Sequence, residues 1–228
     1  MIIDKLVNKS IKISLAIQII TTLISLDGFR IELDDKDKIL KEILTIETIV
    51  QIVEGFFYLW IMFALKDMKL MTPRRYIDWT ITTPIMLLST IIFFKYSEYK
   101  EKKQDRKFTL KEFYNENKDN IIKIIIYNGF MLLFGFLGET NIIDKRIGIP
   151  IGFFFFYKSF SLIYNEYAVY SEIGKKLFKV LLILWSLYGI SAMLPIKEKN
   201  LGYNILDIFA KNFYGLYIYY LIRQARIK

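Results

Sequence analysis

Apolar runs about twenty residues long recur along the chain and are separated by charged segments. A helix of that length crosses about 30 Å of hydrocarbon, so each run is typical of a membrane-spanning helix. Seven such helices are predicted, at 11–27, 40–65, 75–95, 119–138, 147–169, 173–195 and 201–222. The pattern therefore predicts an all-α membrane protein, a bundle of seven transmembrane helices in a lipid bilayer.

The segments between the runs are short, except for 96–118 (YSEYKEKKQDRKFTLKEFYNENK), whose charge density excludes it from lipid. The first run is not read as a signal peptide, because it lacks a small-residue cleavage site and is followed by the charged segment GFRIELDDKDK. No low-complexity linker interrupts the sequence, so residues 1–228 are expected to form a single domain.

Composition supports a membrane protein, with 54% hydrophobic residues and a mean hydropathy of +0.32. The chain has no cysteine and no histidine, which excludes disulfides, thiol nucleophiles, Ser/His/Asp triads and the usual zinc sites. Neither a GxxxxGK loop nor a GxGxxG motif is present. We therefore expect neither an enzyme nor a metal site.

The formal net charge of +9 could indicate a nucleic-acid partner. In a membrane protein, lysines and arginines in loops that face the cytoplasm explain such a charge, so no nucleic acid is expected. With the N-terminus outside, the cytoplasmic segments hold 17 Lys and Arg residues and the outside segments hold 11. This asymmetry predicts an extracellular N-terminus and a cytoplasmic C-terminus.

Charged residues inside the predicted helices point to a functional site, because each costs roughly 2.5–3.5 kcal/mol at the bilayer centre. Asp207 and Lys211 are four residues apart in the seventh run and share one helix face. Asp78 lies in the third run, one turn after Arg75. We expect both carboxylates to converge on Lys211, with Arg75 offsetting the remaining negative charge. Lys158 has no carboxylate one turn away and is expected to extend toward the interface or line a cavity.

Weaker polar residues repeat at helical spacing in four runs. These stripes are Ser14, Gln18, Thr21 and Ser25; Glu47 and Glu54; Arg75, Asp78, Thr82 and Ser89; and Asn200, Asn204, Asp207 and Lys211. Polar stripes often only join helices through hydrogen bonds. Four of them, with two additional glutamates, also fit a hydrated path through the bundle, and both interpretations stay open.

Residues 75–84 read R-Y-I-D-W-T-I-T-T-P and resemble the third-helix signature of the microbial rhodopsins, R-Y-x-D-W-x-x-T-T-P. Residues 207–211 are similar to the D-x-x-x-K of that family's seventh helix, and Trp185 with Tyr188 resembles its sixth-helix W-x-x-Y. The glycine-rich fourth helix of the family is matched by Gly129, Met131, Gly135 and Gly138. The resemblance covers essentially the whole chain and implies a seven-helix bundle of the microbial rhodopsin type.

The resemblance implies that Lys211 binds all-trans retinal as a protonated Schiff base, with Asp78 and Asp207 as its counter-ions and Arg75 beside them. The residues that would enclose the chromophore are Trp79, Thr83, Met131, Gly135, Trp185 and Tyr188. Light would then move the charged nitrogen relative to its carboxylates. The resemblance also implies transport of monovalent cations or protons, and it is compatible with a homo-oligomer.

Two positions differ from the pattern of the family's outward proton pumps. Ser89 stands where those pumps carry a carboxylate, and serine cannot supply a proton near neutral pH. Before the seventh helix, where pumps have acidic residues for proton release, only Glu198 is present. Slow return of the proton to the Schiff base is therefore expected.

Within the family, a further set of residues resembles the group-one viral rhodopsins, which implies a light-gated cation channel. This set is Glu47, Glu54, Asn200, Asn204 and Asn212. In that interpretation Ser14, Glu54 and Asn204 form a central gate, while Glu47 and Asn212 lie on the cytoplasmic side of the path. Two alternatives remain. Asp78 and Thr82 are compatible with an outward proton pump, and a photosensor that signals through a partner protein is the third hypothesis.

Overall fold

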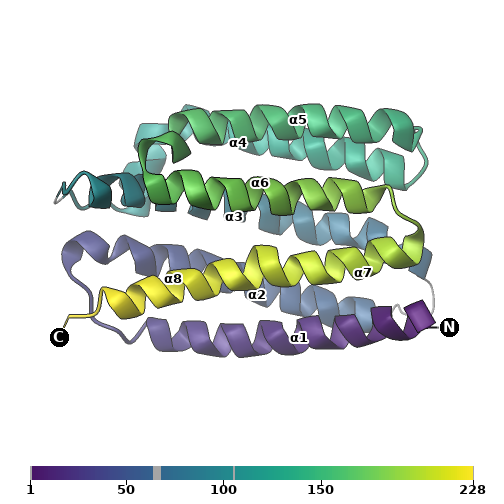
Figure 1. Ribbon diagram of the computed structural model, residues 1–228, viewed down its shortest axis with the longest axis horizontal. Coiled ribbons are helices and arrows are strands. Elements are labelled where there is room, and N and C mark those ends of the chain that lie inside the picture. Colours follow the sequence, from purple (N-terminus) through teal and green to yellow (C-terminus); the bar gives the residue numbers. More distant parts are fainter. Residues whose placement is uncertain (1, 64–67, 105, 228) are drawn as a thin grey trace.

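The computed structural model describes residues 2–63, 68–104 and 106–227, and its helices lie side by side as long rods (Figure 1). The α-helices are α1 (Ile2–Gly28), α2 (Ile39–Phe63), α3 (Met71–Glu101), α4 (Leu110–Glu139), α5 (Lys145–Glu166), α6 (Glu172–Ala192), α7 (Ile196–Asp207) and α8 (Phe213–Gln224). Short 3₁₀ turns occur at Asp35–Asp37, Met68–Leu70 and Ala168–Tyr170. Over the described ranges, the only β pairing is a single antiparallel bridge between Leu33 and Arg226.

The last rod consists of α7, a π turn at Ile208–Asn212 and α8, which follow one another without a break. Counted as one rod, they complete the seven-helix bundle that the sequence predicts, and the all-α fold class is confirmed. Five of the described helical segments are long and apolar enough to cross a membrane on length and hydropathy alone. Helix α6 carries three lysines within its first eight residues, and the seventh rod is divided by the π turn.

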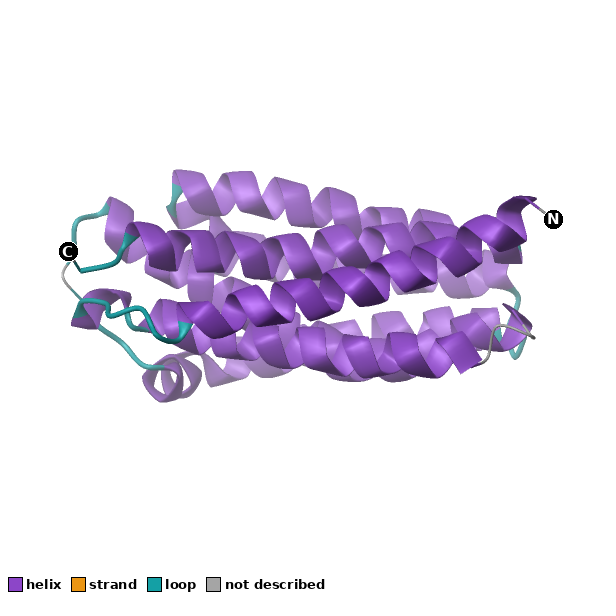
Figure 2. Ribbon diagram, turned by 90° about the horizontal axis from the view of Figure 1, so that it is seen from below, coloured by secondary structure: helices purple, strands orange, loops and turns teal. Residues whose placement is uncertain are grey.

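Successive rods run in opposite directions, so the bundle has two distinct ends (Figures 1 and 2). We call the end that holds the N-terminus and the α6–α7 connection the N end. The opposite end, which holds the C-terminus and the α3–α4 connection, is the C end. At the C end the bridge between Leu33 and Arg226 ties the last residues of the chain to the α1–α2 connection.

The prediction that 96–118 is a long connection is wrong. Helix α3 continues to Glu101 and α4 begins at Leu110, so only 102–109 lies outside the helices. At the start of α4, the hydroxyl of Thr109 accepts from the Glu112 amide at 3.2 Å, and the Glu112 carboxylate accepts from the Thr109 amide at 2.8 Å. This reciprocal cap starts the helix inside the charged segment. The helices therefore extend past their apolar parts. Similarly, α1 begins at Ile2 rather than at residue 11.

Apolar side chains cover the outside of the bundle as well as its interior. Phe56, Phe63 and Phe154 are 69%, 85% and 53% exposed. Such an exposed apolar surface is costly in water but is expected of a helix bundle whose backbone polar groups are satisfied within each helix and whose sides face lipid.

Candidate functional site

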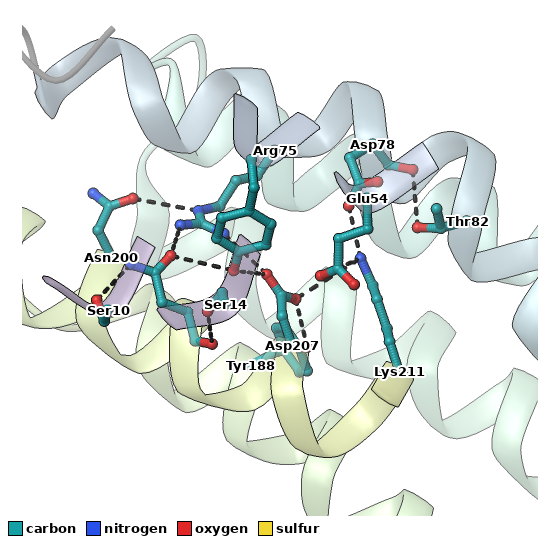
Figure 3. A network of polar contacts seen from close by, with 12 residues as sticks. Ser10, Ser14, Glu54, Arg75, Asp78, Thr82, Tyr188, Asn200, Asp207 and Lys211 are labelled. Atoms are coloured by element: carbon teal, nitrogen blue, oxygen red, sulfur yellow. Dashed lines mark hydrogen bonds and ion pairs between the residues drawn. The ribbon is translucent and has the colours of Figure 1, made fainter. Parts of the chain in front are cut away.

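Lys211 lies in the π turn of the seventh rod, and its side chain is buried in the middle of the bundle. Its Nζ is 2.7 Å from a carboxylate oxygen of Asp78, 3.2 Å from one of Glu54 and 3.9 Å from one of Asp207 (Figure 3). Single π turns inside α-helices occur frequently at functional sites. Three carboxylates from α2, α3 and α7 therefore surround one buried lysine.

Asp207 accepts more hydrogen bonds than either of the other two acids. It receives the Tyr58 hydroxyl at 2.6 Å, the Tyr188 hydroxyl at 2.7 Å and Nη1 of Arg75 at 3.1 Å. Arg75 is completely buried and also donates to the side-chain oxygens of Asn204 and Asn200. A carboxylate with three such donors is stabilised in its charged form.

Glu54 lies beside Lys211 in the structure. The sequence-based expectation assigned only Asp78 and Asp207 to this lysine and placed Glu54 in the ion path. With Glu54 included, three acids face two cations, Lys211 and Arg75, and all five side chains are buried. An unpaired buried charge is costly, so this cluster is balanced when one of its carboxyl groups holds a proton. Glu54 is the candidate, because it lies farther from the Lys211 nitrogen than Asp78 does, 3.2 against 2.7 Å, and its other contact is the neutral amide of Gln18.

An apolar cavity of about 110 Å³ extends from Lys211 between α3, α4, α5 and α6. All six residues that the sequence assigned to a chromophore pocket line it: Trp79, Thr83, Met131, Gly135, Trp185 and Tyr188. Further wall residues include Tyr76, Met86, Phe153, Gly189 and Tyr203. An elongated apolar molecule with one end at the Lys211 nitrogen fits this cavity, since pockets of this kind combine apolar walls with a few polar groups.

Glycines shape the cavity wall at two places. A Cβ on Gly135 would lie 2.8 Å from the Tyr76 hydroxyl, and one on Gly189 would overlap the Phe153 ring. The other two glycines of the fourth-helix resemblance do not line the cavity. Gly129 has nothing within 4 Å of its Cβ position, and Gly138 packs against α5 near Lys145.

The predicted polar stripes face one another across α1, α2, α3 and the seventh rod. Ser14 donates to the backbone carbonyl of Asn204 at 3.1 Å (Figure 3). Gln18 donates to Glu54. Thr21 donates to the side chain of Asn212 at 2.6 Å. Thr82 bonds to the carbonyl of Asp78 rather than to its carboxylate. The stripes thus form one buried polar seam.

Toward the C end, Ser89 donates its hydroxyl to the carboxyl group of Glu47. Both side chains are completely buried. The sequence indicated that the Ser89 position lacks an acid. In the folded protein a carboxyl group from α2 lies at this position instead, which sequence spacing within α3 could not reveal.

Two residues of this region escaped the sequence-based search. Tyr58 is one turn after Glu54 on α2 and donates its hydroxyl to Asp207. Extending the Glu47 and Glu54 stripe by one turn would have included it, but an aromatic residue within an apolar run was counted as apolar. Lys199, assigned to a connection by its charge, is completely buried and pairs with Glu139 at 2.7 Å. Lys158, by contrast, lies exposed on α5 with its Nζ 5.5 Å from the centre of the Phe154 ring, outside the cavity.

Solved structures of rhodopsins share this fold. A viral rhodopsin, OLPVRII, has 27% sequence identity with this chain and a TM-score of 0.81, with 96% of this chain and 98% of that chain covered. The rhodopsin of Exiguobacterium sibiricum has 17% identity and a TM-score of 0.78 over 99% and 98% of the two chains. Halorhodopsin, a light-driven chloride pump, has 16% identity and a TM-score of 0.74 over 96% of each chain. A comparison with curated proteins gives no match.

The model of the bacteriorhodopsin-like protein family matches residues 9–225. The chain belongs to this family, and it is a microbial rhodopsin similar to a viral rhodopsin, as its motifs indicated. Members of the family are integral membrane proteins that bind retinal and act as photoreceptors and ion transporters rather than as enzymes. The apolar cavity that ends at a buried lysine fits this cofactor.

The cavity glycines give a first test of retinal binding. We expect Gly135→Leu to reduce retinal uptake roughly 5- to 100-fold, because overpacking a filled wall costs about 1–3 kcal/mol and each 1.4 kcal/mol is tenfold in affinity. Gly129→Leu, on the same helix, is the matched control and should bind retinal normally, since nothing lies near its Cβ. Titration of the purified retinal-free protein with retinal, followed by visible absorbance, measures both. Equal uptake by the two variants would contradict the cavity assignment.

Proposed function

We propose that this protein is a light-gated cation channel whose retinal is joined to Lys211 by a protonated Schiff base. Bound retinal would supply the absorption of light and the change of shape that displaces the charge at this nitrogen. Asp78 and Asp207 act as counter-ions, and the distances of 2.7 and 3.9 Å from Lys211 support these roles. The residues of the cavity wall hold the chromophore and exclude water from it.

The observation that carries the channel proposal is the buried polar seam, which continues on both sides of Lys211. Toward the N end it contains Ser14, Asn204, Asn200 and Arg75, and toward the C end it contains Gln51, Thr21, Asn212, Glu47 and Ser25. Within the described residues, side-chain atoms of Gln51, Glu47, Ser25 and Asn212 are buried without a hydrogen-bond partner. Buried polar atoms are normally satisfied, by ordered water where protein groups are missing. A hydrated path explains these atoms, whereas side chains that only joined helices would bond to one another.

Around Lys211, ion pairs and hydrogen bonds between charged side chains connect the helices across the seam. Glu54 contacts both Gln18 and Lys211, and Arg75 contacts Asn204 and Asp207. These contacts link α1, α2, α3 and the seventh rod in the resting protein. We assign Ser14, Glu54 and Asn204 to a central gate, with Glu47 and Asn212 on the far side toward the C end. Movement of charge at Lys211 would break these contacts and open the seam.

We further propose that the N end faces the cell exterior and the C end the cytoplasm. The sequence segments predicted to face the cytoplasm hold 17 Lys and Arg residues and those predicted to face outside hold 11, a bias typical of cytoplasmic segments. Cations would then enter from the Arg75 side and leave past Glu47. Monovalent cations and protons are the expected ions.

Voltage-clamp recording from cells that express the protein with all-trans retinal tests the channel directly. We expect an inward or outward photocurrent whose direction follows the driving force and whose reversal potential shifts when the external cation concentration changes. Darkness should abolish it. A photocurrent that keeps one direction at every voltage would contradict the channel.

The contact between Glu47 and Ser89 favours a second candidate, an outward proton pump, because it supplies an acid at the position where the sequence lacked one. A pump acidifies the medium on illumination, and a protonophore removes the pH change. The same voltage series separates the two functions, since a pump current does not reverse near an ion's equilibrium potential.

A further inference from the structure

Helices α5 and α6 lie side by side along the apolar cavity, and the packing between them changes along their length (Figure 1). Toward the C end, aromatic rings from the two helices pack against each other. The ring centre of Phe160 lies 5.4 Å from that of Trp185, and the ring centre of Tyr164 lies 5.0 Å from that of Phe178. Ring packing of this kind closes the C-end half of the boundary between α5 and α6.

Farther toward the N end, the boundary between these helices depends on one ring that lies against a glycine. A Cβ on Gly189 of α6 would overlap the Phe153 ring of α5, so this ring lies directly on the α6 backbone. Among the described residues, the one ring pair that Phe153 forms is with Phe156 of its own helix. Ile149 and Ala192 line the cavity nearby and bring no second ring. The boundary is therefore weaker here than toward the C end.

Phe153 and Gly189 reach both the cavity and the outside of the bundle. They line the cavity and yet are only half-buried, whereas Trp79 in the α3 part of the wall is buried. Their neighbours in sequence, Phe154 and Ile190, are exposed on the lipid-facing surface. The cavity itself is not fully enclosed and is open on one side. At this level the Phe153 ring thus lies between the cavity and the surrounding lipid.

A route to Lys211 from either end of the bundle would pass through charged or closely packed groups. On the N-end side, Arg75 is bonded to Asp207 and Asn204. On the C-end side, the buried side chains of the largest core cluster fill the space between the helices. Retinal is apolar along most of its length, and apolar molecules leave water for hydrocarbon. A route from the bilayer through an apolar boundary avoids separating buried ion pairs, which is costly.

We propose that Phe153 and Gly189 form a lateral gate between α5 and α6, through which the cavity takes up retinal from the bilayer. In the closed gate the Phe153 ring lies on Gly189 and separates the cavity from lipid. Rotation of the ring away from the glycine opens the boundary, and its return closes it. Glycine is required at position 189 because any side chain there would hold the ring away from the α6 backbone. The inference rests on the proposed function in one respect, that the cavity binds retinal, and it applies equally to a channel and to a pump.

Reversible cross-linking tests the route, and only the introduced thiols react because the chain has no cysteine. Phe153→Cys combined with Gly189→Cys places one thiol on each side of the lateral gate, and a short bis-thiosulfonate reagent joins them. We expect the cross-linked, retinal-free protein in lipid vesicles to take up retinal at least about tenfold more slowly than before cross-linking, because a tethered gate cannot open. Reduction of the cross-link should restore the rate. The matched control joins α4 to α5 through Phe130→Cys with Phe155→Cys, whose rings lie 4.9 Å apart outside the cavity, and should leave the rate unchanged.

Single substitutions test the role of the ring. Phe153→Ala should speed the uptake of retinal roughly 2- to 10-fold, because the contacts of an aromatic ring no longer have to be broken when the gate opens. Gly189→Ala should also speed it, because its methyl group displaces the Phe153 ring. In a protein that already carries Phe153→Ala, the addition of Gly189→Ala should change the rate no further, since both residues act through one contact. Stopped-flow absorbance of the retinal-free proteins mixed with retinal-containing vesicles measures all three.

A second ligand separates entry into the cavity from attachment to Lys211. All-trans retinol has no aldehyde and cannot join a lysine, so energy transfer to it from Trp79 and Trp185, which line the cavity, reports its arrival alone. The cross-link at the lateral gate should slow this signal as much as it slows the appearance of colour.

Three results would overturn the lateral gate: an unchanged rate of uptake in the cross-linked protein, equal slowing by the α4–α5 cross-link, or independent effects of Phe153→Ala and Gly189→Ala. An unmodified protein that gives neither colour with retinal nor energy transfer to retinol would instead contradict the proposed function, and this inference with it.

Discussion

Lys211→Ala should give a protein that stays colourless with all-trans retinal and carries no photocurrent. The cavity contains one lysine among its lining residues, so its removal leaves retinal no nitrogen to attach to. Visible absorbance of the purified protein after incubation with retinal measures this result. The expected effect is the largest for any single substitution, a complete loss rather than a reduction.

A folding defect must be separated from this loss, because the variant leaves three acids facing Arg75 alone. Removing one partner of a buried ion pair commonly costs about 3–5 kcal/mol. Size-exclusion chromatography is the check for such a defect, and the loss of colour is informative when Lys211→Ala is monodisperse. Lys158→Ala removes an exposed lysine from α5 and should become coloured normally. Colour in Lys211→Ala would place the attachment elsewhere and refute the account.

Glu54→Ala should reduce the photocurrent at least tenfold while the protein remains coloured. Removal of Glu54 leaves two acids for two cations, so the charge of the cluster stays balanced and the lysine keeps Asp78 at 2.7 Å. The seam, however, loses the contacts that Glu54 makes with Gln18 and with Lys211. Current per coloured protein, recorded under voltage clamp, measures the effect.

The control for Glu54→Ala is Glu42→Ala, which removes an acid from the same helix outside the seam and should leave the current unchanged. Glu54→Gln separates charge from hydrogen bonding, because the amide keeps a polar group beside Gln18 and should retain more current than alanine. An unchanged current in Glu54→Ala would exclude this carboxyl group from the ion path.

The order and type of the helices could be predicted from the chain because a membrane-spanning helix has to be apolar over a fixed length. Helix ends could not be predicted in the same way. Charged residues beyond the apolar run of α3 remain helical, supported by ion pairs of Glu98 with Lys95 at 2.9 Å and with Lys102 at 2.6 Å. Such pairs stabilise a helix outside lipid, and the apolar pattern does not report them.

The site, too, could be predicted only in part. Asp78, Asp207 and Lys211 could be predicted, since each is a costly charge in an apolar run and two of them share a face. The spacing of Glu47 and Glu54 placed both side chains on one face of their helix, but it did not predict which residue each of them contacts. Those partners, Lys211 and Ser89, come from other helices, and their pairing depends on how the rods pack.

The π turn determines how insertions and deletions in the seventh rod change its contacts. An α-helix advances 100° per residue, and a wider turn delays that rotation. The polar residues before it, Asn200, Asn204 and Asp207, and the small residue after it, Gly215, therefore follow two different helical registers. A residue inserted into or deleted from the regular part of either half would rotate one half against the other by about 100°, so Gly215 would no longer meet Gln51. Such changes should be far less tolerated there than in the Lys102–Thr109 connection.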